Sequence, residues 1–97
     1  MTDIIKYNEQ VFENIKHVNE YGQEFWYARE LMIILEYKQW RNFNSIVDKA
    51  KIACESSKNK VLDHFADVSK MVKAGVSYKE IKDIKLSRYA CYLIAQN

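Results

Sequence analysis

The stretch His64–Ser87, HFADVSKMVKAGVSYKEIKDIKLS, decides which class of fold this chain can adopt. Its second half, YKEIKDIKL, alternates polar and apolar residues near its end, as a strand does. A helical spacing instead fits four apolar residues of the first half, Phe65, Val68, Met71 and Val72. Gly75 divides the stretch into halves of similar length. Periodicity alone leaves a helix and a β-hairpin both open.

The residues before this stretch have clearer patterns. Gly22 lies in NEYGQE between NIKHV and FWYA, two short segments rich in β-branched and aromatic residues. This arrangement predicts a hairpin with a loop at 20–23. The segment ARELMIILEY then changes to a helical period, which predicts a helix over about 28–36.

The clearest amphipathic helix is predicted over about 40–55. Spacing at about 100° per residue places one apolar stripe inward, namely Trp40, Phe43, Ile46, Val47, Ala50 and Cys54. Arg41 and Ile52 face away from that stripe. A final helix is predicted from about 87, with Ser87 as N-cap, and we expect it to fray after about Ala95 or to be completed by a neighbouring chain. The predicted core includes Trp40, Phe43, Val47, Cys54, Phe65, Tyr89 and Cys91.

Composition and charge narrow the function classes. The 97 residues are 48% hydrophobic and 29% charged, which is typical of a single small domain. The longest apolar run is Leu31–Leu35, far short of the roughly 20 residues that span a bilayer, and no signal segment begins the chain. The sequence therefore predicts a cytoplasmic protein without membrane contact. Cys54 and Cys91 have no metal-binding spacing and are expected to be buried free thiols.

The charge is distributed unevenly along the chain. Residues 1–36 carry three basic and seven acidic side chains, whereas residues 37–97 carry twelve basic and six acidic ones. The basic part favours a nucleic acid or another acidic surface as partner, and a mixed solvated surface explains it equally well.

The sequence lacks the residue patterns that enzymatic catalysis needs. Asp63 and His64 are sequence neighbours, so neither a helix nor a strand places them as a catalytic dyad. A metal site made of Cys54, His64 and Cys91 lacks ligand spacing and a fourth ligand. No cluster of glycines forms a nucleotide-binding loop. We therefore predict no catalytic residue, metal or cofactor.

The sequence fits a binding function better than a catalytic one. The helices at 28–36 and 40–55 have the proportions of a helix-turn-helix unit, although a plain helical corner is as common. On DNA, the start of the second helix would present Lys38, Arg41 and Asn42, and Arg41 is the strongest candidate of the three. Trp40 lies on the apolar stripe, which favours a core position over a base-stacking one.

A second group of basic residues lies in the stretch 64–87, on either side of Gly75. It consists of Lys70, Lys73, Lys79, Lys82 and Lys85, with Arg88 expected near the same surface and facing outward. On an exposed hairpin these side chains can follow a phosphate backbone. Lysines that protect an exposed strand edge from aggregation give the same pattern, so both interpretations stay open.

Several strings together are familiar from a known family. They are EFWYARELMIILEYKQWRNF, KAKIAC followed by Ser56 and Ser57, DHFADVSKMV and DIKLSRYACYLIAQN. In this order they resemble the N-terminal region of the DNA-damage-inducible protein D family over about residues 12–97. More loosely, WYARELMIILEY, an aromatic-basic helix and DIKLS resemble the N-terminal domains of BRO-type phage antirepressors, for which DNA binding is the usual proposal.

The resemblance implies a fold and a role. It implies strands at about 66–73 and 79–86, hence a single α+β domain over 1–97 with two β-hairpins and about three helices. It also implies a role in the bacterial DNA-damage response, acting on recombination through DNA or the recombinase filament. Members of the family continue past the AQN string, so we expect either a natural short protein or a fragment.

Three functional hypotheses follow. The first is a non-enzymatic DNA-binding module that uses Lys38, Arg41 and the basic surface at 70–88. The second is a protein-interaction module that inhibits or modulates a recombinase, a repressor or another DNA-transaction enzyme, for which exposed Ile52 would matter more than lysines. The third is a homodimer that forms through the uncapped apolar end of the chain.

Overall fold

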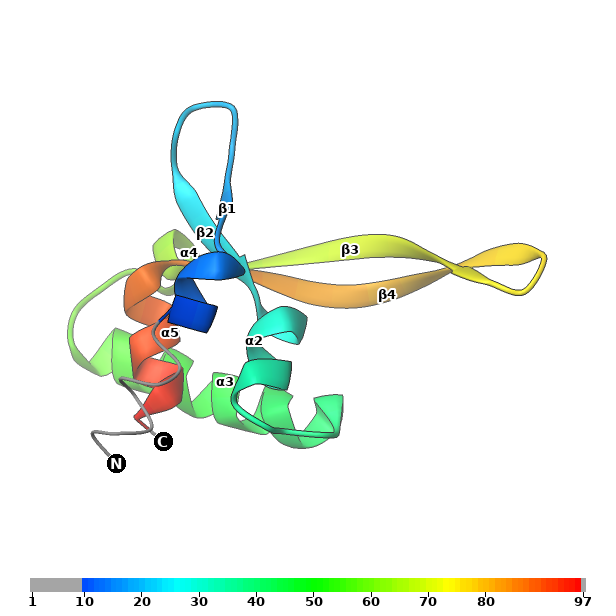
Figure 1. Cartoon of the computed structure of the whole chain (residues 1–97). Helices are drawn as coiled ribbons and strands as arrows, with labels where there is room; N and C mark the ends of the chain where they lie inside the picture. Colours follow the sequence, from blue (N-terminus) through cyan, green and yellow to red (C-terminus); the bar gives the residue numbers. More distant parts are fainter. Residues whose placement is uncertain (1–9, 97) are drawn as a thin grey trace.

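The structure is a computed structural model, and it describes residues 10–96. Two β-hairpins project from a group of helices (Figure 1), and a helical segment at 10–14 precedes the first strand. The further elements are β1 His17–Val18, β2 Glu24–Tyr27, α2 Ala28–Ile34, α3 Trp40–Ser56, α4 Val61–His64, β3 Phe65–Ala74, β4 Ser77–Leu86 and α5 Arg88–Ala95. The predicted α+β class is confirmed.

The ambiguous stretch forms a long hairpin, which we call the long arm (residues 65–86). β3 and β4 pair antiparallel in unbroken register from Phe65 opposite Leu86 to Ala74 opposite Ser77. Gly75 occupies the first turn position with a φ of +65°, whereas Val76 has no positive φ, which is the pattern of a type II′ turn. The strands match the pair expected at 66–73 and 79–86. The helical spacing of the first half is therefore misleading, because no neighbouring element lies over residues 71–74 to bury a helical face.

The predicted first hairpin is also present, and we call it the short arm (residues 17–27). The Asn19 side-chain oxygen accepts hydrogen bonds from the backbone N–H groups of Tyr21 and Gln23, at 2.9 and 3.0 Å. Gly22 supplies a φ of +79° in that loop. β2 of the short arm pairs with β4 of the long arm at Trp26 opposite Leu86 and Tyr27 opposite Lys85, which gives the strand order β1-β2-β4-β3. The two arms therefore diverge from a common base (Figure 1).

The turns that follow α2 and α3 each contain a residue other than glycine in the left-handed backbone conformation. After α2, Glu36 has a φ of 66°, and the Tyr37 N–H donates to the Met32 carbonyl at 3.0 Å. After α3, Lys58 has a φ of 65° and Asn59 donates to a carbonyl in the last turn of α3 in the same way. These are Schellman-type helix ends, in which a left-handed residue satisfies free carbonyls. They explain how a chain with two glycines ends its helices.

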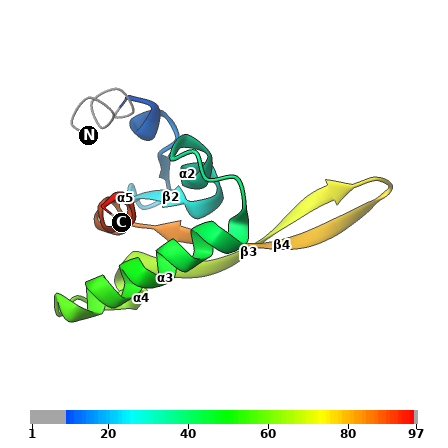
Figure 2. The same cartoon turned by 90° about the horizontal axis from the view of Figure 1, so that it is seen from below.

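The core lies at the base of the two arms, between the sheet, α3 and α5. Its buried apolar residues are Trp26, Ala28, Leu31, Phe43, Val47, Ala50, Cys54, Phe65, Ile84, Leu86, Ala90, Cys91 and Ile94. Of the predicted core residues, Trp40 and Tyr89 are half-buried and pack against this cluster, and the other five belong to it. Figure 2 shows α3 crossing beneath the base of the long arm, which extends beyond it. Most of the long arm therefore lies outside the core.

Among the helices of residues 10–96, none has the length and apolar character that crossing a bilayer requires.

Candidate nucleic-acid interface

The outer half of the long arm is exposed on both of its faces. Every residue from 71 to 80 is exposed. Because side chains alternate between faces, the register places Lys73 and Lys82 on the face that carries Phe65 and Leu86, which we call the core-side face. The opposite face, which we call the far face, carries Lys70, Lys79 and Lys85. The arm is thus a ribbon with cations on both faces.

Two of the arm lysines, Lys70 and Lys85, are already occupied. Lys70 Nζ lies 3.0 Å from Asp83 Oδ2 and 3.4 Å from the centre of the Tyr27 ring. Lys85 Nζ lies 4.7 Å from the centre of the Phe25 ring. These contacts fix the base of the arm against the short arm. Within residues 10–96, the side chains of Lys73, Lys79 and Lys82 form no ion pair, so their charges remain available to an anion.

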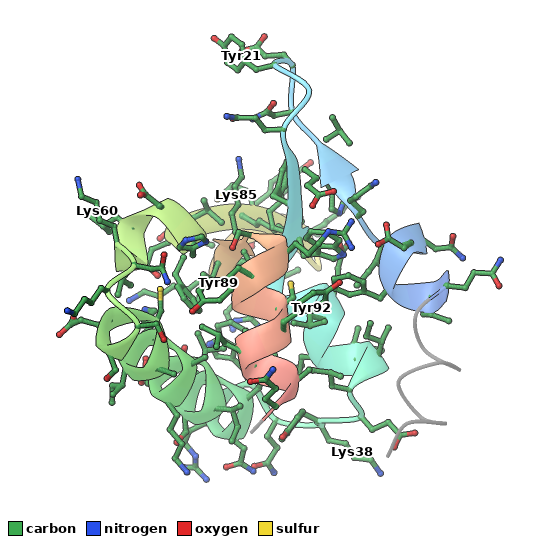
Figure 3. All side chains as sticks on the ribbon, turned by 90° about the vertical axis from the view of Figure 1, so that its left-hand side faces the viewer. Tyr21, Lys38, Lys60, Lys85, Tyr89 and Tyr92 are labelled. Atoms are coloured by element: carbon green, nitrogen blue, oxygen red, sulfur yellow. The ribbon has the colours of Figure 1, made fainter. Side chains whose placement is uncertain are left out.

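The start of α3 presents the other predicted group. Lys38, Arg41 and Asn42 are exposed, and the Asn42 amide donates to Gln39 Oε1 at 3.3 Å. Trp40 is half-buried, and the Arg29 guanidinium covers its ring at 4.2 Å, so it is poorly placed to stack on a base. Figure 3 shows Lys38 below the helices and Lys85 above them. The predicted residues therefore form two separate surfaces.

A shallow groove separates α3 from the core-side face of the long arm. It is lined by Trp40, Asn44, Asp48, Lys51, Asp67, Val68, Ser69, Lys82, Asp83 and Ile84. Aspartates and lysines are mixed along it, so the floor of the groove has no strong preference for a phosphate. Of the three arm lysines without an ion pair, Lys82 lines the groove, whereas Lys73 and Lys79 lie further out on the arm.

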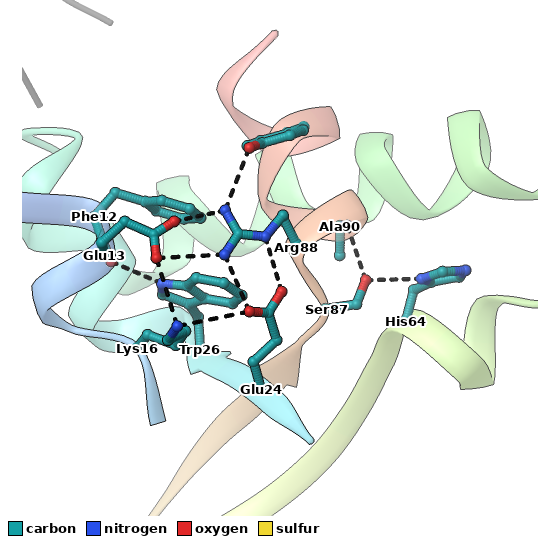
Figure 4. Close-up of polar contacts among 10 residues, drawn as sticks. Phe12, Glu13, Lys16, Glu24, Trp26, His64, Ser87, Arg88 and Ala90 are labelled. Carbon is teal, nitrogen blue, oxygen red and sulfur yellow. Dashed lines mark hydrogen bonds and ion pairs between the residues drawn. The ribbon is translucent and has the colours of Figure 1, made fainter. Parts of the chain in front are cut away.

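Arg88 lies in a different place from the one predicted (Figure 4). Its guanidinium donates to Glu13 Oε1 at 2.6 Å and to Glu24 Oε2 at 2.8 Å, and it lies 5.0 Å from the Trp26 ring centre. Hydrogen bonding to Arg88 lowers the pKa of both carboxyl groups, and those bonds raise the pKa of Arg88. Arg88 therefore holds the 10–14 segment and β2 against α5 instead of facing outward, and we leave it out of the interface.

The two histidines have structural contacts. His64 Nδ1 lies 2.7 Å from Ser87 Oγ, and that oxygen also accepts the Ala90 N–H at 3.0 Å, as an N-cap of α5 does. His17 Nε2 lies 2.6 Å from Glu30 Oε1, and its ring packs against Phe25. The Ser87–His64 contact superficially resembles a nucleophile and its base, but the hydroxyl is used to begin a helix. The predicted N-cap role of Ser87 is confirmed.

The cysteines are free and buried, as predicted. Burial raises the pKa of both the Cys54 and the Cys91 thiol, which keeps them protonated and unreactive. Among residues 10–96, no three side chains of the metal-binding types come together as a candidate site.

Comparison with known proteins gives two similarities. The sequence profile of the BRO family, N-terminal domain, matches residues 14–97. DNA damage-inducible protein D of Escherichia coli (strain K12) is 47% identical over 91 residues, which are 93% of this chain and 33% of that protein. The chain thus spans about a third of the length of this relative. No solved structure matches the chain.

Proposed function

Because the chain belongs to the BRO family of N-terminal domains, we propose that it is a non-enzymatic DNA-binding module of a bacterial or phage DNA-damage-response protein. Its family and its similarity to a DNA damage-inducible protein support a DNA-damage or antirepressor-type role. The main support for DNA binding is the long arm. It is a projecting ribbon with three lysines that have no acidic partner among the described residues. A polyanion supplies the missing negative charge.

The shape of the arm favours a groove of duplex DNA. A two-stranded β-ribbon fits within a DNA groove, where phosphate strands run on both sides. Lys79 lies on one face of the ribbon and Lys73 and Lys82 on the other, so cations can reach both phosphate strands. The exposed residues at the start of α3, Arg41 among them, form a second surface that we assign to the same interface. The proposed interface comprises Lys73, Lys79, Lys82, Lys38, Arg41 and Asn42.

The arm lysines are expected to determine the salt dependence of binding. The pair Lys73→Ala and Lys79→Ala should weaken binding to a duplex roughly tenfold at low salt, and should lower the slope of log affinity against log salt by about 0.9 per lost phosphate contact. Fluorescence anisotropy at several salt concentrations measures both quantities. The control pair, Lys49→Ala and Lys60→Ala, removes two exposed lysines outside the arm. Equal losses in both pairs would mean that net charge alone governs binding.

Arg41 is expected to contribute affinity without contributing stability. Its side chain is exposed, so Arg41→Ala should weaken DNA binding about three- to tenfold, as loss of one charged contact does, while the melting temperature stays unchanged. Arg41→Lys is the matched control, because it keeps the phosphate-binding charge but removes the planar fork that reads a base edge. A variant with a lowered melting temperature and unchanged affinity per folded molecule would contradict this role.

One observation favours a second candidate function, that of a protein-interaction module acting on a recombinase or repressor. Ile52 is 67% exposed on α3, as predicted, and offers an apolar contact to a partner. The same titration separates the two functions. Absence of any binding to duplex or single-stranded DNA at about 50 mM salt, where phosphate contacts are strongest, would reject the DNA-binding module.

A further inference from the structure

The apex of the long arm carries an apolar residue, Val76, that no part of residues 10–96 covers. Val76 is fully exposed in the turn, and Tyr78 is 67% exposed beside it, whereas Met71, 63% exposed, lies further back along the arm, opposite Glu80. An apolar residue at the end of an exposed hairpin contributes nothing to the core, and it invites aggregation. Gly75 already supplies the backbone conformation of the turn, so the turn itself does not require valine at the next position. The apolar apex therefore needs a different explanation.

We propose that the long arm bends duplex DNA by inserting Val76 between neighbouring base pairs. This proposal rests on the proposed function and adds a deformation of the DNA to it. Proteins that bend DNA through the minor groove combine cations that contact the phosphates with an apolar wedge that partly unstacks one base step. The long arm has both parts in that order, because Lys73 and Lys79 lie just behind Val76 on the two strands.

The length of the arm allows this contact. Ten residues in each strand at about 3.3 Å per residue give an arm of roughly 30 Å. The molecule measures 44 × 30 × 30 Å, and the arm extends along its long direction (Figure 1). The apex can thus reach into a duplex while the core of the fold stays outside it. The contacts of Lys70 with Asp83 and Tyr27 tie the inner half of the arm to the short arm.

Charge favours DNA over a protein surface or a second copy of this chain. The residues next to the apex include two lysines and one glutamate, Lys73, Lys79 and Glu80. Two copies that met at their apices would bring those cations together, which costs free energy. A duplex neutralises them and offers stacked bases to the apolar residue.

The test measures binding and bending in parallel. A duplex of about 30 base pairs carries a donor and an acceptor dye at its ends, so a bend of the size that wedges produce raises the energy transfer. We expect the wild-type chain to raise the transfer efficiency. Val76→Ser should abolish most of this rise while the affinity from anisotropy falls less than about fivefold, because the lysine contacts remain. Val76→Leu, which keeps an apolar apex, should retain the bend.

The matched control is Leu62→Ser on α4. Leu62 is 85% exposed and lies outside the arm, so its replacement makes the same kind of chemical change without touching the apex. It should alter neither affinity nor bending. Circular dichroism verifies that each variant stays folded.

Each other outcome has a defined meaning. A bend that survives Val76→Ser, or wild-type binding without any bend, overturns the wedge while leaving the DNA-binding module intact. Loss of a concentration-dependent oligomer on Val76→Ser, measured by light scattering, also overturns it and assigns the apex to a contact between copies. Absence of wild-type DNA binding rejects the proposed function and the wedge together.

Discussion

The variant Asp83→Ala is expected to lose about 3–5 kcal/mol of unfolding free energy, the range for a buried ion pair broken on one side. Asp83 is 1% exposed although its neighbour Lys82 on the long arm is exposed. Its Oδ1 accepts the backbone N–H of Arg29 at 3.0 Å and that of Ile84 at 2.8 Å, and its Oδ2 pairs with Lys70. The residue before α2, Tyr27, makes no side-chain cap, so this carboxylate on β4 caps the helix instead.

Chemical denaturation measures the loss, and Asp67→Ala is the matched control. Asp67 is an exposed aspartate on the same arm, and its removal should change the free energy of unfolding by less than about 0.5 kcal/mol. Equal stability of the two variants would contradict the structural role of Asp83.

The pairing of Asp83 with Lys70 can be isolated by a double-mutant cycle. The variant Lys70→Met leaves the carboxylate buried with two N–H donors, so it should also be destabilised. The double variant with Asp83→Asn should be more stable than the sum of the single losses predicts, by about 1–3 kcal/mol. Additive losses would mean that the 3.0 Å contact contributes no coupling of its own.

The second large effect is expected at Arg88. Replacement by Met removes hydrogen bonds to Glu13 and Glu24, and it leaves two neighbouring carboxylates without their main cation. The melting temperature should fall by roughly 5–10 °C, since bidentate charge-assisted bonds are the strong ones and small domains have steep temperature dependence. Tyr92→Phe is a mild control, because its hydroxyl is the weakest partner of Arg88, at 3.5 Å. Equal melting temperatures for both variants would contradict this role of Arg88.

The same cluster predicts how stability depends on pH. Arg88 lowers the pKa of Glu13 and Glu24 below the ordinary value of 4.5 in the folded chain. Glu13 and Glu24 therefore add to the free energy of unfolding above about pH 5. This stabilisation is lost as the pH falls through their lowered pKa values in the folded chain. As the pH is lowered from 6 to 3, the melting temperature should fall more steeply for the wild type than for Arg88→Met. Parallel curves for the two proteins would show that other carboxylates cause the acid sensitivity.

The sequence predicted much of the fold because apolar periodicity reports which side of an element is buried. The stripe on α3 needed only helical spacing, and Ser87 needed only its position before an apolar run. The loop of the short arm followed from Gly22 and its polar neighbours. The long arm did not follow from periodicity, since its outer half buries nothing and leaves no pattern to read. Resemblance to a family supplied those strands.

The sequence predicted most residues of the candidate site, but it did not predict how their side chains are paired. The sequence identified all of the arm lysines, yet it gave no sign that Lys70 is paired and that Lys73, Lys79 and Lys82 have no ion-pair partner among the described residues. Arg88 has the same charge as they do, and only its two partners, from the 10–14 segment and β2, distinguish its role. Asp83 lies within an alternating KDIK string that looks fully solvated.

By itself, the sequence determined α2, α3 and α5, the short arm, the buried thiols and the basic character of the second part of the chain, because each depends on neighbours within one or two turns. It did not predict α4 or the helical segment at 10–14. The tertiary structure alone decided which charges are neutralised and which remain free. Ion pairs such as Arg88 with Glu13 and Lys70 with Asp83 join distant parts of the chain, and local spacing carries no information about them. It also placed Val76 at the exposed end of the long arm.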